Sequence, residues 1–68
     1  MLFIDFHKNL YPQSSILKAI KAFQGIAKFT IKQKNRYIRV GVYDYDNGYH
    51  KVIKQEFCNY VLASIKSP

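Results

Sequence analysis

The chain has 68 residues and a formal net charge of +7, with 11 Lys and Arg against 4 Asp and Glu. We expect residues 1–68 to form a single small domain, and a hydrophobic fraction of 49% with 16% aromatic residues excludes a disordered chain. The single cysteine, Cys58, excludes an internal disulfide and fits a reducing compartment, so we expect a cytoplasmic protein.

The first predicted element is a strand, "LFIDFH", in which every second residue from 2 to 6 is apolar. This alternation indicates a strand with one buried face. The following segment, "KNLYPQSS", turns the chain into a helix that starts between Tyr11 and Ser15. Pro12 suits the first helical turn because its missing N–H is not needed there, and Ser14 or Ser15 is a candidate cap.

The first predicted helix is "SSILKAIKAFQG", and its apolar residues recur at the spacing of one helical face. That face consists of Ile16, Ala19, Ile20 and Phe23. Gly25 is a natural residue to end the helix, because glycine readily takes the left-handed conformation that often follows a helix.

A β-hairpin is predicted next, from Ile26–Lys32 paired with a strand that runs from Arg36 to Tyr43 or Asp44. The segment "QKNR" makes the turn, and Asn35 tolerates a left-handed backbone conformation there. Apolar residues alternate with basic and aromatic ones along both strands, so one face of the hairpin is expected to pack on a core.

The segment "DYDNGYH" contains Asn47 and Gly48, a strong turn signal. It would suit a further hairpin with a short strand at Tyr49 to Val52, but we favour a loop that leads into a second helix. The segment "HKVIKQEFCNYVLASIK" supports the helix, because its apolar residues form one stripe. The stripe consists of Ile53, Phe57, Tyr60, Val61 and Ile65.

The predicted order is strand, helix, strand, strand, helix. Both helices must bury their stripes, and the only large apolar surface is one face of the sheet. We therefore predict an α+β two-layer sandwich, βαββα, with a three-stranded sheet and two helices on one face. The predicted core is Leu2, Ile4, Phe6, Ile16, Ile20, Phe23, Phe29, Ile31, Ile38, Val40, Val42, Ile53, Phe57, Val61 and Ile65.

Residues for catalysis, cofactors or metal binding do not converge in the sequence. His7, His50 and Cys58 are far apart and lie on different predicted elements, so we expect no metal site, and Cys58 is expected to pack as a small apolar residue. No phosphate-binding loop or nucleophile motif is present. We expect no enzyme and no cofactor. No apolar run approaches the roughly 18 residues of a membrane-spanning helix, so no membrane partner is expected.

The other face of the predicted sheet is basic and aromatic. It carries Phe3, Asp5, His7, Lys28, Thr30, Lys32, Tyr37, Arg39 and Tyr43. The strong positive charge favours anionic partners. The candidate partner-binding residues on this face are Lys28, Lys32, Tyr37, Arg39 and Tyr43.

Three uses of this face stay open from the residues alone. A protein or peptide partner could dock on the face or add to an exposed strand edge. Single-stranded nucleic acid could stack on Phe3, Tyr37 and Tyr43 while the basic residues contact phosphates. In a homodimer the face would be the interface itself, and its basic side chains would then need acidic partners such as Asp5.

The two predicted helices resemble a known family. "LYPQSSILKAIKAF" is similar to the "YP-x-x-x-I-x-x-A" opening of HxsD, the His-Xaa-Ser system protein, and "QEFCNYVLASIK" is similar to the "eF-x-N-x-L-L" helix that closes that family. The matched positions are Tyr11, Pro12, Ile16, Ala19, Phe23, Glu56, Phe57, Asn59 and Leu62.

The resemblance implies a small accessory protein of a radical-SAM peptide-modification system. Such systems modify a ribosomally made precursor peptide. The family member is not the radical enzyme, and this chain has no cluster-binding cysteines of its own. The implied role is to bind the precursor peptide, the modifying enzyme, or both. From the residues alone, Tyr11 is also expected to staple the start of the helix to the core.

Overall fold

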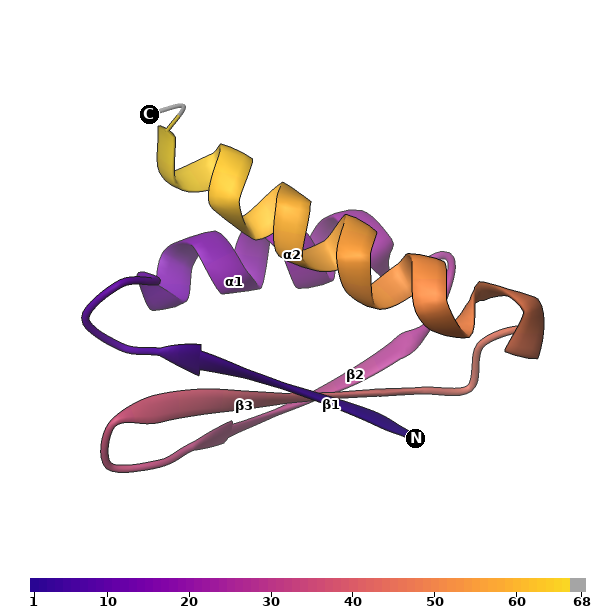
Figure 1. Cartoon of the computed structure of the whole chain (residues 1–68), viewed down its shortest axis with the longest axis horizontal. Helices are drawn as coiled ribbons and strands as arrows, with labels where there is room; N and C mark the ends of the chain where they lie inside the picture. Colours follow the sequence, from indigo (N-terminus) through magenta and orange to yellow (C-terminus); the bar gives the residue numbers. More distant parts are fainter. Residues whose placement is uncertain (67–68) are drawn as a thin grey trace.

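The computed structural model describes residues 1–66 and places two helices over one face of a three-stranded sheet (Figure 1). The elements in chain order are β1 (Leu2–His7), α1 (Gln13–Phe23), β2 (Lys28–Gln33), β3 (Tyr37–Tyr43), a short 3-10 turn η1 (Asn47–Tyr49) and α2 (His50–Lys66). The predicted α+β sandwich with βαββα order is therefore confirmed. The alternative short strand at Tyr49 to Val52 is absent, because this segment is helical.

β3 is the central strand, with β1 and β2 antiparallel on either side of it. The register puts Ile4 and Ile31 beside Val40, and Asp5 and Lys32 beside Arg39. Directly opposed residues share a face of the sheet, and neighbouring residues of one strand point to opposite faces. The Val40 row therefore faces the helices, and the Arg39 row faces away from them.

The core centres on Phe57, which is fully buried. Its ring lies 5.2 Å from that of Phe29, 5.5 Å from that of Phe23 and 6.1 Å from that of Phe6, measured between centroids. Phe57 thus joins α2 to α1 and to both outer strands. The buried apolar residues are Ile4, Phe6, Ile16, Ala19, Ala27, Ile38, Val40, Val42, Ile53, Phe57 and Val61. Most of the predicted core is confirmed.

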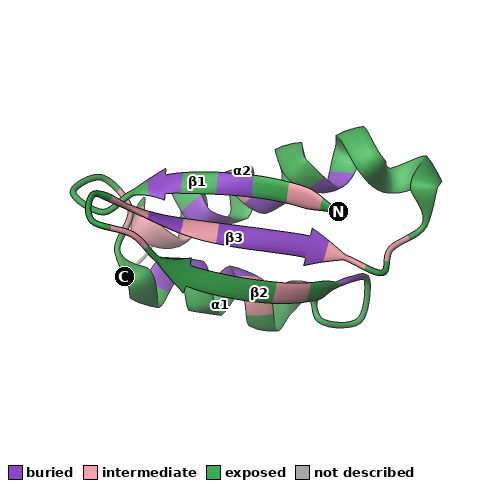
Figure 2. Ribbon diagram, turned by 90° about the horizontal axis from the view of Figure 1, so that it is seen from below, coloured by how far each residue is buried: buried purple, intermediate pink, exposed green. Residues whose placement is uncertain are grey.

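The prediction that Ile31 belongs to the core is wrong, because 38% of this residue is exposed. β2 is an outer strand with a hydrogen-bonded neighbour on one side only. Gln33, two residues further along the same face, is also exposed. The second half of β2 therefore extends past the cover of the helices, and Figure 2 shows exposure along most of this strand.

α1 starts at Gln13, within the predicted range, and ends at Phe23, shortly before Gly25 as predicted, but neither end is capped in the predicted way. Pro12 is the N-cap residue in an extended conformation, with no side-chain cap, while Ser15 is buried inside the helix. Gly25 has no positive φ, so it does not end the helix through a left-handed conformation. Instead the N–H groups of Ile26 and Ala27 both donate to the Phe23 carbonyl, at 2.9 and 3.2 Å. β2 consequently starts at Lys28 and not at Ile26.

Asn35, which tolerates a left-handed conformation, does not adopt one in the β2–β3 turn. Among the described residues the one non-glycine residue with a positive φ is Asp44, at 56°, and not Asn35. Asp44 follows β3 and redirects the chain toward η1. Its carboxylate lies 3.2 Å from the Lys28 ammonium, so this bend is also tied to the start of β2.

Candidate functional site

The sheet face turned away from the helices carries all five predicted partner-binding residues, and Figure 2 views the molecule from this side. β3 places Tyr37, Arg39 and Tyr43 on it, because the alternate residues of that strand are buried under the helices. We call this surface the open face. It consists of Phe3, Asp5, His7, Lys28, Thr30, Lys32, Tyr37, Arg39, Gly41 and Tyr43.

Arg39 is at the centre of the open face and is held on two sides. Its Nε and Nη2 donate to the two carboxylate oxygens of Asp5, at 2.9 and 3.2 Å. Its guanidinium carbon lies 5.5 Å from the centre of the Phe3 ring and 6.0 Å from that of Tyr37. These distances suit cation–π contacts, and the paired hydrogen bonds set the plane of the guanidinium. Arg39 is therefore presented in a defined orientation.

The Asp5–Arg39 pair alters the acid–base behaviour of both groups. The hydrogen bond from Arg39 holds the pKa of the Asp5 carboxyl below its ordinary value, and the Asp5 carboxylate raises the pKa of Arg39. Both side chains are more than a third exposed. Exposed ion pairs contribute little to folding, so the main effect of this pair is to orient the guanidinium.

Gly41 allows the side chains of the outer strands to approach β3 closely. It lies opposite Phe3 on one side and Thr30 on the other. A Cβ atom at Gly41 would collide with the Thr30 hydroxyl and would touch the Phe3 ring at 3.5 Å. The absence of a side chain at Gly41 therefore leaves a shallow depression on the open face. Phe3 lies beside it, and 52% of this residue is exposed. Glycine inside a central strand was the sequence signal for this close approach.

Much of the positive charge on the open face is neutralised within the chain. Asp5 pairs with Arg39, and Asp44 pairs with Lys28. Of the predicted basic contacts, only Lys32 has no ion pair among residues 1–66. Asp5, which was considered as an acidic partner for basic side chains across a homodimer interface, instead pairs with Arg39 of its own chain. The face is less suited to phosphates than the sequence alone indicated.

Of the residues considered for metal binding or catalysis, His7 lies on the open face, whereas His50 and Cys58 lie apart from it on α2. Cys58 is half-buried on α2 and packs against the core, as predicted, and burial raises the pKa of its thiol. The Tyr45 hydroxyl and His50 Nδ1 are 2.6 Å apart, with the two rings stacked. Within residues 1–66 no three His, Cys, Asp or Glu side chains gather in a way that could hold a metal ion.

Most of the residues that carry the resemblance to HxsD proteins fall into two groups. Ile16, Ala19 and Phe57 are fully buried, and Tyr11 packs edge-on against Phe6 with ring centroids 5.1 Å apart. The expected staple at the start of α1 is thus present, and packing accounts for these matches. A second group is exposed on α2 and has no packing role of this kind: Glu56, Asn59 and Leu62.

Comparison of the chain with known proteins gave no match among family models, curated proteins or solved structures. In the part of the chain that the structure describes, none of the helices has the length and apolar character needed to cross a membrane.

Proposed function

We propose that this chain is a non-enzymatic binding protein that docks a protein or peptide segment on the open face. The observation that supports this most directly is the fixed Arg39 guanidinium between Phe3 and Tyr37. Arginine has five N–H donors, and Asp5 takes two of them. The others are available to carbonyl or carboxylate oxygens of a partner.

The composition of the open face matches that of protein interfaces. Aromatic residues and arginine are enriched at the centres of such interfaces, where unpaired lysines are depleted. Phe3, Tyr37 and Tyr43 provide apolar contact area around Arg39, and Lys28 is already paired with Asp44. A peptide could lie across the three strands with apolar side chains against Phe3 and with its backbone oxygens near Arg39.

The partner we propose is a precursor peptide or a radical-SAM modifying enzyme in ribosomal peptide maturation. This finer proposal rests on the resemblance of α1 and α2 to HxsD proteins. The helices that carry the resemblance cover one face of the sheet (Figure 1). A partner docked on the open face would therefore not contact those helices. We propose the cytoplasm as the compartment in which this docking takes place.

Nucleic acid is the second candidate partner, because the open face carries the rings of Phe3, Tyr37 and Tyr43 together with Lys32, which has no ion pair among residues 1–66. We rank nucleic acid second because the ion pairs of Lys28 and Arg39 leave less positive charge available to phosphates. Binding to phosphates weakens steeply with salt, because the released counterions drive it. A labelled single-stranded oligonucleotide titrated at two salt concentrations separates the two candidates, since strong salt-dependent binding would favour nucleic acid.

The main proposal is tested with the products of the genes beside the one for this chain. If they encode a radical-SAM enzyme and a short peptide, each purified product is titrated with this chain by calorimetry. We expect the double variant Tyr37→Ala with Arg39→Ala to bind about tenfold more weakly or worse, since truncated interface centres commonly cost this much. Lys18→Ala, on the exposed side of α1, is the control and should bind as the wild type does. Unchanged affinity of the double variant would contradict docking on the open face.

A further inference from the structure

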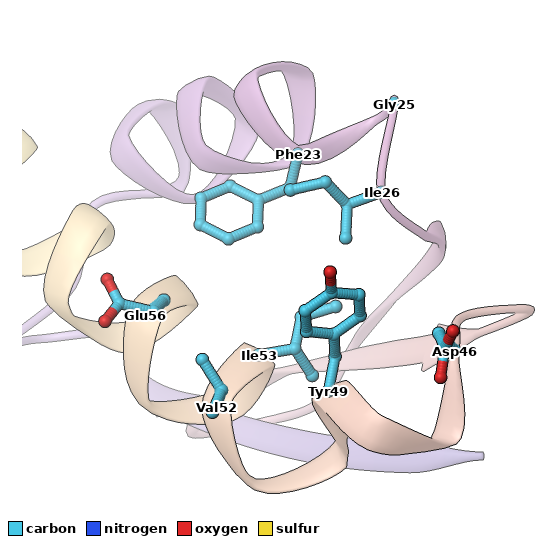
Figure 3. A pocket seen from close by; sticks show the side chains of 8 residues that line it. All are labelled: Phe23, Gly25, Ile26, Asp46, Tyr49, Val52, Ile53 and Glu56. Carbon is cyan, nitrogen blue, oxygen red and sulfur yellow. The ribbon is translucent and has the colours of Figure 1, made fainter.

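A hollow of about 460 Å³ lies where the connection after α1 passes the start of α2 (Figure 3). This size is within the range of pockets that enclose a small ligand or a few side chains. We call it the end groove. It is lined by Phe23, Gly25, Ile26, Asp46, Tyr49, Val52, Ile53 and Glu56.

Apolar side chains are exposed around the end groove to an unusual degree. The exposed fractions are 52% for Ile26, 53% for Tyr49 and 51% for Val52. Single exposed apolar residues are common on proteins, but a group of them around one hollow indicates a binding surface. Figure 3 shows these side chains gathered around the hollow, with Tyr49 facing Ile26 across it.

Hydrogen bonds of the backbone and of the Asp46 side chain hold both sides of the end groove. On one side, the bonds from Ile26 and Ala27 to the Phe23 carbonyl keep Ile26 outside the sheet. On the other side, Asp46 Oδ1 accepts from the Gly48 N–H at 2.9 Å, and the Tyr49 N–H donates to the Asp46 carbonyl at 2.9 Å. The groove therefore exists before any partner binds.

The floor of the end groove is continuous with the core. Ile53 is buried, and the Phe23 ring packs edge-on against both Phe57, at 5.5 Å, and Tyr60, at 5.8 Å. Side chains that pack into a core have fixed rotamers, so binding here costs little ordering of the protein. An apolar side chain that enters the groove would meet a rigid surface.

The end groove also holds the two acidic side chains of this strongly basic chain that have no ion pair among residues 1–66. The sequence has only 4 Asp and Glu against 11 Lys and Arg. Asp5 and Asp44 are in ion pairs. The other two, Asp46 and Glu56, both line the groove, and neither has an ion pair among the residues described. Figure 3 places their carboxylates at opposite ends of the apolar part.

We propose that the end groove is a second docking site, for a peptide segment of a partner protein that has a large apolar side chain next to Lys or Arg. The apolar side chain would pack between Ile26, Tyr49 and Val52, and the cation would lie beside Glu56 or Asp46. Charge complementarity selects this occupant, since two carboxylates repel the phosphates of a nucleic acid and attract a cation. The site lies outside the open face, so its failure in a test would leave the proposed function intact.

The proposal is tested by NMR titration of the full chain with three capped peptides. The first is acetyl-Ser-Leu-Lys-Leu-Ser-amide; the second has Glu in place of Lys, and the third has Ser in place of both Leu. At an ionic strength of about 0.15 M the screening length is roughly 8 Å, which limits repulsion from the distant lysines of the chain. We expect the first peptide to shift the amide signals of residues 23–26 and 46–56, and to bind about fivefold more tightly than either of the others.

Two pairs of variants assign the binding to the end groove. The double variant Asp46→Asn with Glu56→Gln should remove the preference for Lys over Glu, while the new amide side chain at position 46 keeps an oxygen that can accept from Gly48. Asp44→Asn is its matched control, since Asp44 is paired with Lys28 and does not line the groove. Ile26→Gln should weaken binding of the first peptide, and Leu62→Gln, which is also exposed but lies elsewhere on α2, should not.

Three results would overturn the proposal. One is the absence of shifts at about 2 mM of the first peptide, since even a weak site would be partly filled at that concentration. Another is equal binding of the Lys and Glu peptides. The last is self-association in sedimentation that Ile26→Gln abolishes, because a second copy of the chain would then occupy the groove.

Discussion

The open face and the end groove differ in whether their acidic side chains form ion pairs within the chain. On the open face, Asp5 orients Arg39 and Asp44 pairs with Lys28. In the end groove, Asp46 and Glu56 line an exposed apolar hollow without ion pairs among the residues described. Paired charges fix the geometry of a surface, whereas unpaired charges beside apolar side chains are available to a partner. The open face thus presents an arginine in a fixed orientation, and the end groove presents two carboxylates that have no ion pair among the residues described.

The open face and the end groove depend on the same core, so a substitution that unfolds the core should abolish both. This is the largest effect that we expect. Phe57→Ala deletes the ring that packs against Phe6, Phe23 and Phe29. Replacement of a buried phenylalanine by alanine costs about 3–5 kcal/mol, a large share of the stability of a domain this small. We expect the variant to be largely unfolded by circular dichroism at about 37 °C. A folded variant with a wild-type Tm would contradict the central place of Phe57 in the core.

Gly41→Val should disturb the open face and leave the end groove unchanged. The new side chain would collide with Thr30 and press on Phe3, so the open face must rearrange. Overpacking of this kind costs about 1–3 kcal/mol in the free energy of unfolding, measurable by urea denaturation. The end groove lies away from Gly41, and NMR signals of Ile26 and Val52 should keep their positions. Large shifts at those residues would show that the surfaces are coupled.

The smallest expected effect is the response of the open face to acid. Arg39 lowers the pKa of Asp5 below its ordinary value of 3.8, so the unfolded chain takes up a proton at this group before the folded chain does. The stabilisation is therefore complete only well above the ordinary pKa of 3.8 and is lost as the pH falls through the lowered pKa of the folded state. Asp5→Asn removes this contribution. The stability difference between wild type and variant should shrink as the pH is lowered from about 5 to about 2, in urea denaturation at each pH. A difference that stays constant over this range would contradict the Asp5–Arg39 pair.

The sequence predicts the open face far better than the end groove, for a physical reason. The alternation of apolar and polar residues in "RYIRVGVY" assigns each residue of β3 to a face, whatever the order of the strands. The pairing of Asp5 with Arg39 needs more, because it depends on β1 lying beside β3 in one particular register. The exposure of Ile31 likewise depends on β2 being an outer strand. Neither fact is present in local patterns.

The end groove has almost no local signal. It forms where the turn around Gly25 and Ile26 meets Tyr49 and Val52, residues far apart in the chain. The predicted strand began at Ile26, since an isoleucine beside other apolar residues favours a strand. The two hydrogen bonds to the Phe23 carbonyl instead keep Ile26 in a turn. The sequence also does not show which acidic residues lack ion pairs. That depends on the three-dimensional contacts that pair Asp5 with Arg39 and Asp44 with Lys28.

The most direct test of the proposed function asks which face of the sheet touches the partner. The photoreactive amino acid p-benzoylphenylalanine is placed at position 3, on the open face, or at position 17, on α1. The natural residues there, Phe3 and Leu17, are exposed to similar extents, at 52% and 47%. Each protein is irradiated with the product of a neighbouring gene that binds this chain in the calorimetric titration. We predict a crosslink from position 3 and none from position 17. A crosslink from position 17 alone would contradict docking on the open face.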